Sequence, residues 1–120
     1  MNPPIQSYRD LIAWQKAFTL GITLHRLAGT FPDSEKFGLI AQIRRGSIDV
    51  AANIARGYGS GNQPDYLWHL KAARGDIYKL DTQLLFALEL KYITDETWEN
   101  AKSKLDEAER VLAGLIRSLR

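Results

Sequence analysis

The sequence predicts an all-α protein, an antiparallel up-and-down four-helix bundle. Three observations support this prediction. Apolar residues recur every three or four positions, no segment shows the alternation typical of a strand, and the connections between the periodic segments are short. A chain of 120 residues builds one hydrophobic core, so we expect a single domain over residues 1–120.

The first two helices are expected over residues 8–28 and 34–56. The first has a wide apolar side and ends near Gly29. Asp33 or Ser34 is expected to cap the second, which ends at a glycine cluster. The second helix has two apolar rows side by side, and two rows predict two packing partners. The rows consist of Leu39, Ile43, Val50 and Ile54, and of Ile40, Ile48, Ala51 and Ala55.

The third and fourth helices are expected over residues 64–90 and 95–119. Pro64 suits a first helical turn, and Thr94 or Asp95 can cap the fourth helix. Each helix has one regular apolar row. These rows include Leu70, Ala73, Ile77, Leu80 and Leu84 in the third helix and Ala101, Leu105, Ala108, Leu112 and Ile116 in the fourth.

Arg44 lies inside the second apolar row of its helix. An arginine on a buried side needs a carboxylate, because an unpaired charge there is strongly destabilising. Asp81, beside the main row of the third helix, is the first candidate, and Asp76 is the second. We therefore expect a structural ion pair between Arg44 and Asp81 that fixes the register of two helices.

Other basic residues lie on the polar side of the second helix, with Lys36 nearby. Lys36, Arg45 and Arg56 are placed there to contact the phosphates of a nucleic acid. Tyr58, in the glycine cluster, can stack on a base. The alternative is a solvated polar face that binds nothing.

Two aromatic residues lie away from the main row of the third helix. Trp68 and Phe86 are 18 residues apart, so they fall at the same angle, with Ala72 and Gly75 close by. Large aromatics beside small residues outside the core predict a subunit interface. Two isolated surface aromatics are the alternative.

The composition argues against several kinds of chemistry. The chain has no cysteine, which excludes disulfides and zinc–sulfur sites. Asp65 and His69 are one helical turn apart but supply too few ligands for a metal ion. The glycine cluster lacks the Lys and Ser/Thr of a phosphate-binding loop. We expect no metal, no cofactor and no enzymatic activity.

A cytoplasmic location is expected. No apolar run approaches the ~20 residues of a membrane span, and Met1-Asn2-Pro3-Pro4 lacks the basic and apolar regions of a signal peptide.

Several motifs, taken in order, resemble the 23S rRNA intervening-sequence protein family, also called the four-helix-bundle proteins. They span about residues 8–93. They are residues 13–17, Phe31-Pro32, residues 38–45, residues 53–59, Ala73-Arg74-Gly75, residues 80–84 and Lys91-Tyr92-Ile93.

The resemblance implies a four-helix bundle that assembles into a ring-like homopentamer, with no established enzymatic activity. The fold also looks related to the accessory proteins of diversity-generating retroelements, which bind a reverse transcriptase and nucleic acid. We therefore expect a non-catalytic homo-oligomer that binds RNA or DNA, or that serves as an adaptor for a nucleic-acid enzyme. The alternative is a protein-binding scaffold without nucleic-acid contact.

Overall fold

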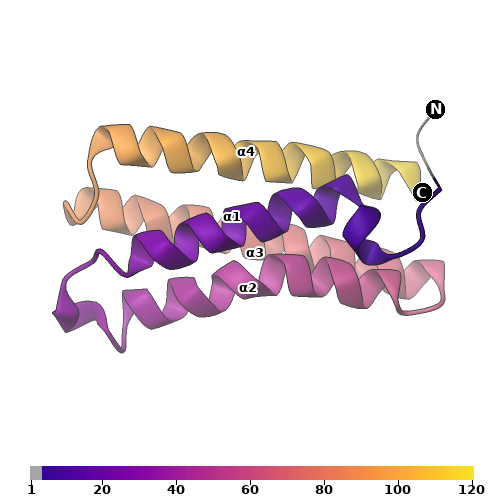
Figure 1. Ribbon diagram of the computed structural model, residues 1–120, viewed down its shortest axis with the longest axis horizontal. Coiled ribbons are helices and arrows are strands. Elements are labelled where there is room, and N and C mark those ends of the chain that lie inside the picture. Colours follow the sequence, from indigo (N-terminus) through magenta and orange to yellow (C-terminus); the bar gives the residue numbers. More distant parts are fainter. Residues whose placement is uncertain (1–3) are drawn as a thin grey trace.

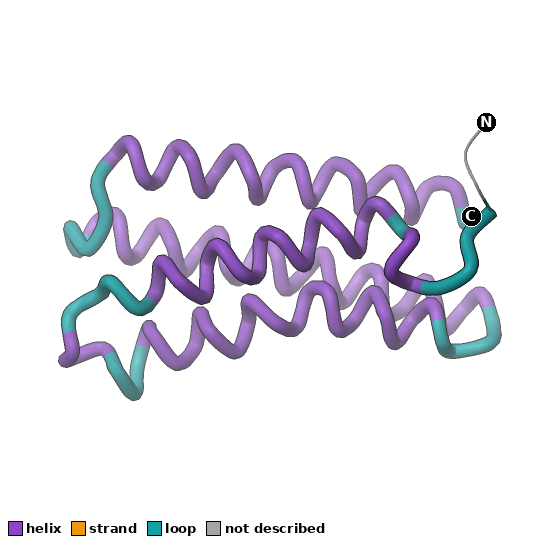
Figure 2. Tube along the Cα trace, in the orientation of Figure 1, coloured by secondary structure: helices purple, strands orange, loops and turns teal. Residues whose placement is uncertain are grey.

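Over residues 4–120, which are the residues described, the computed structural model contains four long helices and no strand (Figures 1 and 2). Each helix runs antiparallel to the one before it (Figure 1). The helices are α1 (Ile12–Ala28), α2 (Leu39–Tyr58), α3 (Gln63–Glu89) and α4 (Asp95–Ser118), and short 3-10 helices η1 (Tyr8–Asp10) and η2 (Asp33–Glu35) precede α1 and α2. The predicted all-α four-helix fold is confirmed.

Residues 1–3 lie outside the described residues. The expected domain over 1–120 and the expectation about a signal peptide both include them, so both stay predictions.

The predicted bounds of α3 and α4 agree with the structure to within one residue. Asn62 caps α3 by accepting the backbone N–H of Asp65 over 2.9 Å. Thr94 caps α4 by accepting the backbone N–H of Thr97 over 3.1 Å. These bounds were predictable because the cap residues are adjacent in sequence to the turns they satisfy.

The first two helices begin later than the sequence predicts. Leu11, with φ −71° and ψ 125°, is extended and separates η1 from α1. The expected cap of α2 by Asp33 or Ser34 is wrong, because both residues lie in η2. Instead, the Glu35 carboxylate accepts the backbone N–H of Leu39, the first residue of α2, over 3.1 Å.

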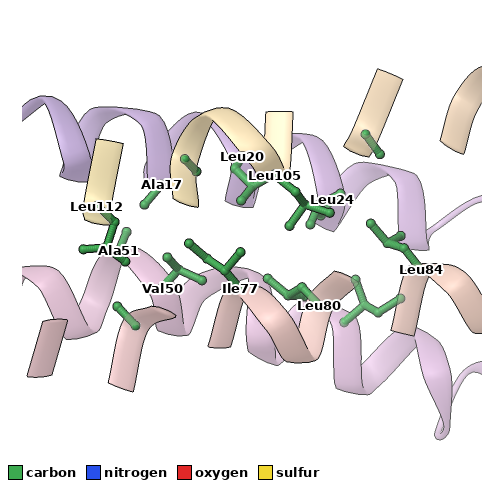
Figure 3. Close-up of a cluster of buried hydrophobic side chains, with 14 of the residues drawn as sticks. Ala17, Leu20, Leu24, Val50, Ala51, Ile77, Leu80, Leu84, Leu105 and Leu112 are labelled. Atoms are coloured by element: carbon green, nitrogen blue, oxygen red, sulfur yellow. The ribbon is translucent and has the colours of Figure 1, made fainter. Parts of the chain in front are cut away.

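Side chains from all four helices meet in the core (Figure 3). The labelled core residues include Leu20 and Leu24 of α1, Val50 of α2, Leu80 of α3 and Leu105 of α4, and each is almost completely buried. As predicted from its two apolar rows, α2 packs against both α1 and α3.

The contact between α1 and α2 is closest at Gly21. A Cβ atom added there would lie 2.3 Å from the carbonyl oxygen of Ser47. The two backbones approach so closely only because residue 21 has no side chain. This crossing fixes the spacing of α1 and α2 on either side of it.

Candidate functional site

Arg44 and Asp81 do not form the predicted ion pair. The Arg44 guanidinium lies over the end of α1, where its Nε donates to the carbonyl oxygen of His25 over 3.2 Å. Asp81 instead pairs with Lys102 of α4, whose Nζ lies 3.2 Å from its Oδ2. Lys102 also pairs with Asp106, 3.1 Å away.

The reason for this error is the direction of the second apolar row. Residue 44 faces α1, since a Cβ atom added to Gly29, just after α1, would lie only 2.5 Å from Nη2 of Arg44. Asp81 faces α4. Arg44 places its charge at the end of α1, where the His25 carbonyl belongs to the negative end of the helix dipole.

Three of the predicted nucleic-acid contacts, Lys36, Arg45 and Arg56, are exposed. The ion pairs found within residues 4–120 join Lys16 to Glu107 and Lys102 to Asp81 and Asp106, so these three cations lie outside all of them. The structure brings Arg45 and Arg56 onto one helix. It places Lys36 apart from them, with its ammonium 5.6 Å from the centre of the Phe37 ring.

Tyr58 ends α2 and is half-buried. Its ring meets the ring of Tyr66 edge-on, with 6.2 Å between the centroids. Burial and the neighbouring Tyr58 raise the pKa of Tyr66 above its ordinary value. Tyr58 therefore has one side packed on α3 and part of its surface left to solvent.

Charge is divided unevenly among the helices. α2 has three arginines, Arg44, Arg45 and Arg56, against one acid, Asp49. α4 has the opposite balance, with six acids against four bases. An anionic partner would therefore be attracted to the α2 side of the bundle rather than to α4.

A groove between α1 and α2, of about 510 Å³, was not predicted. Phe18 and Ile22 of α1 and Ile48 and Ala52 of α2 line it, with Gly21 on its floor. The sequence pattern that could have indicated this groove is the wide apolar side of the first helix together with the second apolar row of the second helix. From the sequence alone, the two rows of α2 predict two packing partners and do not place a groove.

Trp68 and Phe86 are 65% and 60% exposed. Both lie on α3, and Gly75 between them has nothing within 4 Å of the position of an added Cβ. Their exposure agrees with their predicted location outside the core. The subunit interface stays a prediction.

The described residues contain no group of three or more His, Cys, Asp or Glu side chains that could hold a metal ion. Among the described helices, none is long and apolar enough to cross a membrane.

In a comparison with protein families, the 23S rRNA-intervening sequence protein family matches residues 9–114 of the chain. The match covers nearly the whole chain. The chain belongs to this family. No curated protein matches it. In this 23S rRNA-intervening sequence protein, the matched region begins in η1 and ends within the last turns of α4, so it includes every cation of α2 and the exposed Trp68 and Phe86 of α3.

Proposed function

We propose that this protein is a non-catalytic homo-oligomer that binds RNA or DNA through the exposed face of α2, as an adaptor for a nucleic-acid enzyme. The observation that carries the proposal is the pair Arg45 and Arg56, exposed on one helix and outside the ion pairs of the described chain. The family name supports it, because it links these proteins to intervening sequences of rRNA.

The arginines would act through phosphates rather than bases. Residues 45 and 56 are eleven positions apart, which is about 16 Å along a helix, so they would contact phosphates several nucleotides apart. Lys36, before α2, and the exposed part of Tyr58, its last residue, would extend the contact past the two arginines. Such contacts release counterions and make binding depend on salt.

Titrations of a fluorescent single-stranded RNA and a DNA duplex, at several salt concentrations, test the proposal. We expect Arg45→Gln and Arg56→Gln each to weaken binding and to lower the slope of log K against log salt by about one. Arg110→Gln, on the acidic α4, is the matched control and should change neither quantity. Binding that does not respond to salt or to these substitutions would contradict the proposal and favour a protein-binding scaffold.

The homo-oligomer is proposed to form through α3. Trp68 and Phe86 share one stripe of this helix and keep more than half of their surfaces exposed. A single exposed aromatic is ordinary, but two on one stripe beside Gly75 form a surface suited to close packing. The resemblance described above suggests a ring-like pentamer.

Sedimentation tests the interface. We expect Trp68→Ala or Phe86→Ala to produce smaller species at micromolar concentration, whereas Phe37→Ala, which alters an aromatic that is 89% exposed outside this stripe, should not. A wild-type protein that sediments as a monomer would contradict this part of the proposal.

A further inference from the structure

The α1–α2 groove defined above has a continuous aromatic wall. Tyr8 meets Trp14 edge-on at 5.3 Å, and Trp14 stacks on Phe18 at 5.0 Å with 13° between the rings. The outer ring, Phe18, is 48% exposed. Because each ring supports the next, this wall is ordered before any ligand arrives, which lowers the entropy lost on binding.

The opposite wall is one stripe of α2. Residues 45, 48, 52 and 56 are separated by three or four positions and are all exposed, so they form a single ridge. Ile48 and Ala52 occupy its middle and line the groove, whereas Arg45 and Arg56 occupy its ends, just outside the lining residues. The Ile48 side chain is 60% exposed, which is unusual for an isoleucine that lies beside another apolar wall.

The charged residues around the groove are mainly basic, with Asp49 as the one acid of α2 between Arg45 and Arg56. Arg26 lines the groove near the end of α1, where Arg44 donates to the His25 carbonyl. None of the described residues that line the groove is acidic. The groove is therefore apolar along its length and positive at both ends of its α2 wall.

This combination fits an amphipathic helix better than an extended strand or a nucleic acid. The ridge from Arg45 to Arg56 is about 16 Å long, which matches three turns of a docked helix. Apolar side chains of such a helix would replace water over Phe18, Ile22 and Ile48. Carboxylates at its ends would meet the arginines.

A second copy of this chain does not supply that chemistry. Lys79 lies on the α3 stripe between Trp68 and Phe86, so docking this stripe would place a cation against a ridge that has two arginines and one acid, Asp49. α4, which the structure describes in full, has the acids but no large hydrophobic residue that is strongly exposed. No long helix of the described chain combines an acidic surface with an exposed apolar stripe free of lysine.

We propose that the α1–α2 groove docks an amphipathic helix of a partner protein, with aliphatic residues along one face and Asp or Glu at both ends. The occupant is a protein, so this inference goes beyond nucleic-acid binding and does not require it.

A designed peptide tests the groove directly. The probe is a fluorescent peptide of about 14 residues with leucines at helical spacing and glutamates at both ends. Two comparison peptides have the same composition with the leucines permuted, or lysines in place of the glutamates. We expect the first peptide to bind and both comparison peptides to bind at least about tenfold more weakly.

Substitutions in the groove then locate the bound peptide. Phe18→Ala and Ile48→Ser should each weaken binding about tenfold, since truncated anchors at a docking site often have effects of this size. Phe37→Ala, an exposed aromatic in another place, is the control and should leave affinity unchanged. Because Ile48 is exposed, its variant should keep the wild-type circular dichroism and Tm even if the Phe18 variant does not.

Thiol labelling of an introduced cysteine distinguishes the possible occupants, because the chain has no cysteine of its own. In the assembled protein, Ile48→Cys should react as fast as Phe37→Cys and should be protected by the peptide. Protection without the peptide would mean that another copy of the chain covers the groove, and it would overturn the proposal.

Two further outcomes would also overturn the proposal. One is that the permuted peptide binds as tightly as the designed peptide, or that both groove variants bind the designed peptide as tightly as wild type does. The other is that Phe18→Ala lowers the affinity for a single-stranded oligonucleotide, which would make nucleic acid the occupant. Loss of salt-dependent nucleic-acid binding in Arg45→Gln or Arg56→Gln is a separate result, so the two proposals can fail independently.

Discussion

The Tyr92 hydroxyl donates a hydrogen bond to Oε2 of Glu35 over 2.8 Å, joining the connection after α3 to the connection before α2. The other carboxylate oxygen, Oε1, accepts the backbone N–H of Leu39 over 3.1 Å. One side chain therefore caps α2 and links two connections that are distant in sequence. The hydrogen bond from the Leu39 N–H, and to a smaller extent the one from the Tyr92 hydroxyl, hold the pKa of Glu35 below its ordinary value of 4.5.

This link predicts acid-sensitive stability. Because the folded pKa of Glu35 is lower than its unfolded pKa, its stabilising contribution is present above pH 4.5 and is lost as the pH falls through the folded pKa. Glu35→Gln should lower Tm by about a few degrees at neutral pH and should converge with wild type in acid. Thermal unfolding at a series of pH values measures this. Tyr92→Phe should reproduce part of the effect. If the curves of Tm against pH for wild type and Glu35→Gln stay parallel, this contribution of Glu35 is ruled out.

Gly21 predicts a large effect of one methyl group. In Gly21→Ala the new Cβ would be forced against the Ser47 carbonyl, so α1 and α2 must separate. We expect a loss of about 3 kcal/mol in the free energy of unfolding, measured with denaturant. Gly114→Ala is the control, because its Cβ would meet no atom closer than 3.7 Å and should stabilise α4 by up to about 1 kcal/mol. Equal effects of the two substitutions would refute the close crossing.

Lys91 follows the last turn of α3 with φ +63°, where glycine is favoured. The Tyr92 N–H bonds the Ala87 carbonyl over 2.8 Å, and the Lys91 N–H bonds the Leu88 carbonyl over 3.0 Å, the two bonds of a Schellman motif. Lys91→Gly should therefore stabilise the fold by about 0.5–1 kcal/mol. Lys91→Ala removes the same side chain but keeps the strain, so a gain of equal size there would disprove the explanation.

The corrected ion pair predicts which charges are coupled. A double-mutant cycle of Asp81→Asn and Lys102→Gln should give a coupling energy of about 0.5–1 kcal/mol, since the pair is only partly exposed to solvent. The cycle of Asp81→Asn with Arg44→Gln should give none within error. Denaturant unfolding of the single and double variants supplies both values, and a coupling between residues 44 and 81 would restore the pair expected from the sequence.

Much of the fold could be predicted, because its signals are local. The apolar rows of α3 and α4, with Asn62 and Thr94 at their starts, depend on residues within one or two helical turns of each other. The start of α2 was missed for the opposite reason. Its cap is Glu35, a residue outside the helix whose position depends on η2 and on a tyrosine 57 positions away.

The candidate site was predicted less completely. The sequence indicated that Arg45 and Arg56 are exposed and that Trp68 and Phe86 lie outside the core, because an angle on a helix separates inner from outer surfaces. It did not indicate the α1–α2 groove. A groove forms where two helices leave part of their apolar surfaces uncovered, and that depends on how close Gly21 lets them come.

By itself, the sequence determined the number of helices, the extent of α3 and α4, and the sides on which the charged and aromatic residues lie. Only the tertiary structure decided that Arg44 binds the end of α1, that Asp81 pairs with Lys102, and that Phe18 faces Ile48 across a groove. The physical reason is that helical periodicity fixes the direction of a side chain around its own axis. Which neighbour lies in that direction depends on the packing of helices distant in sequence.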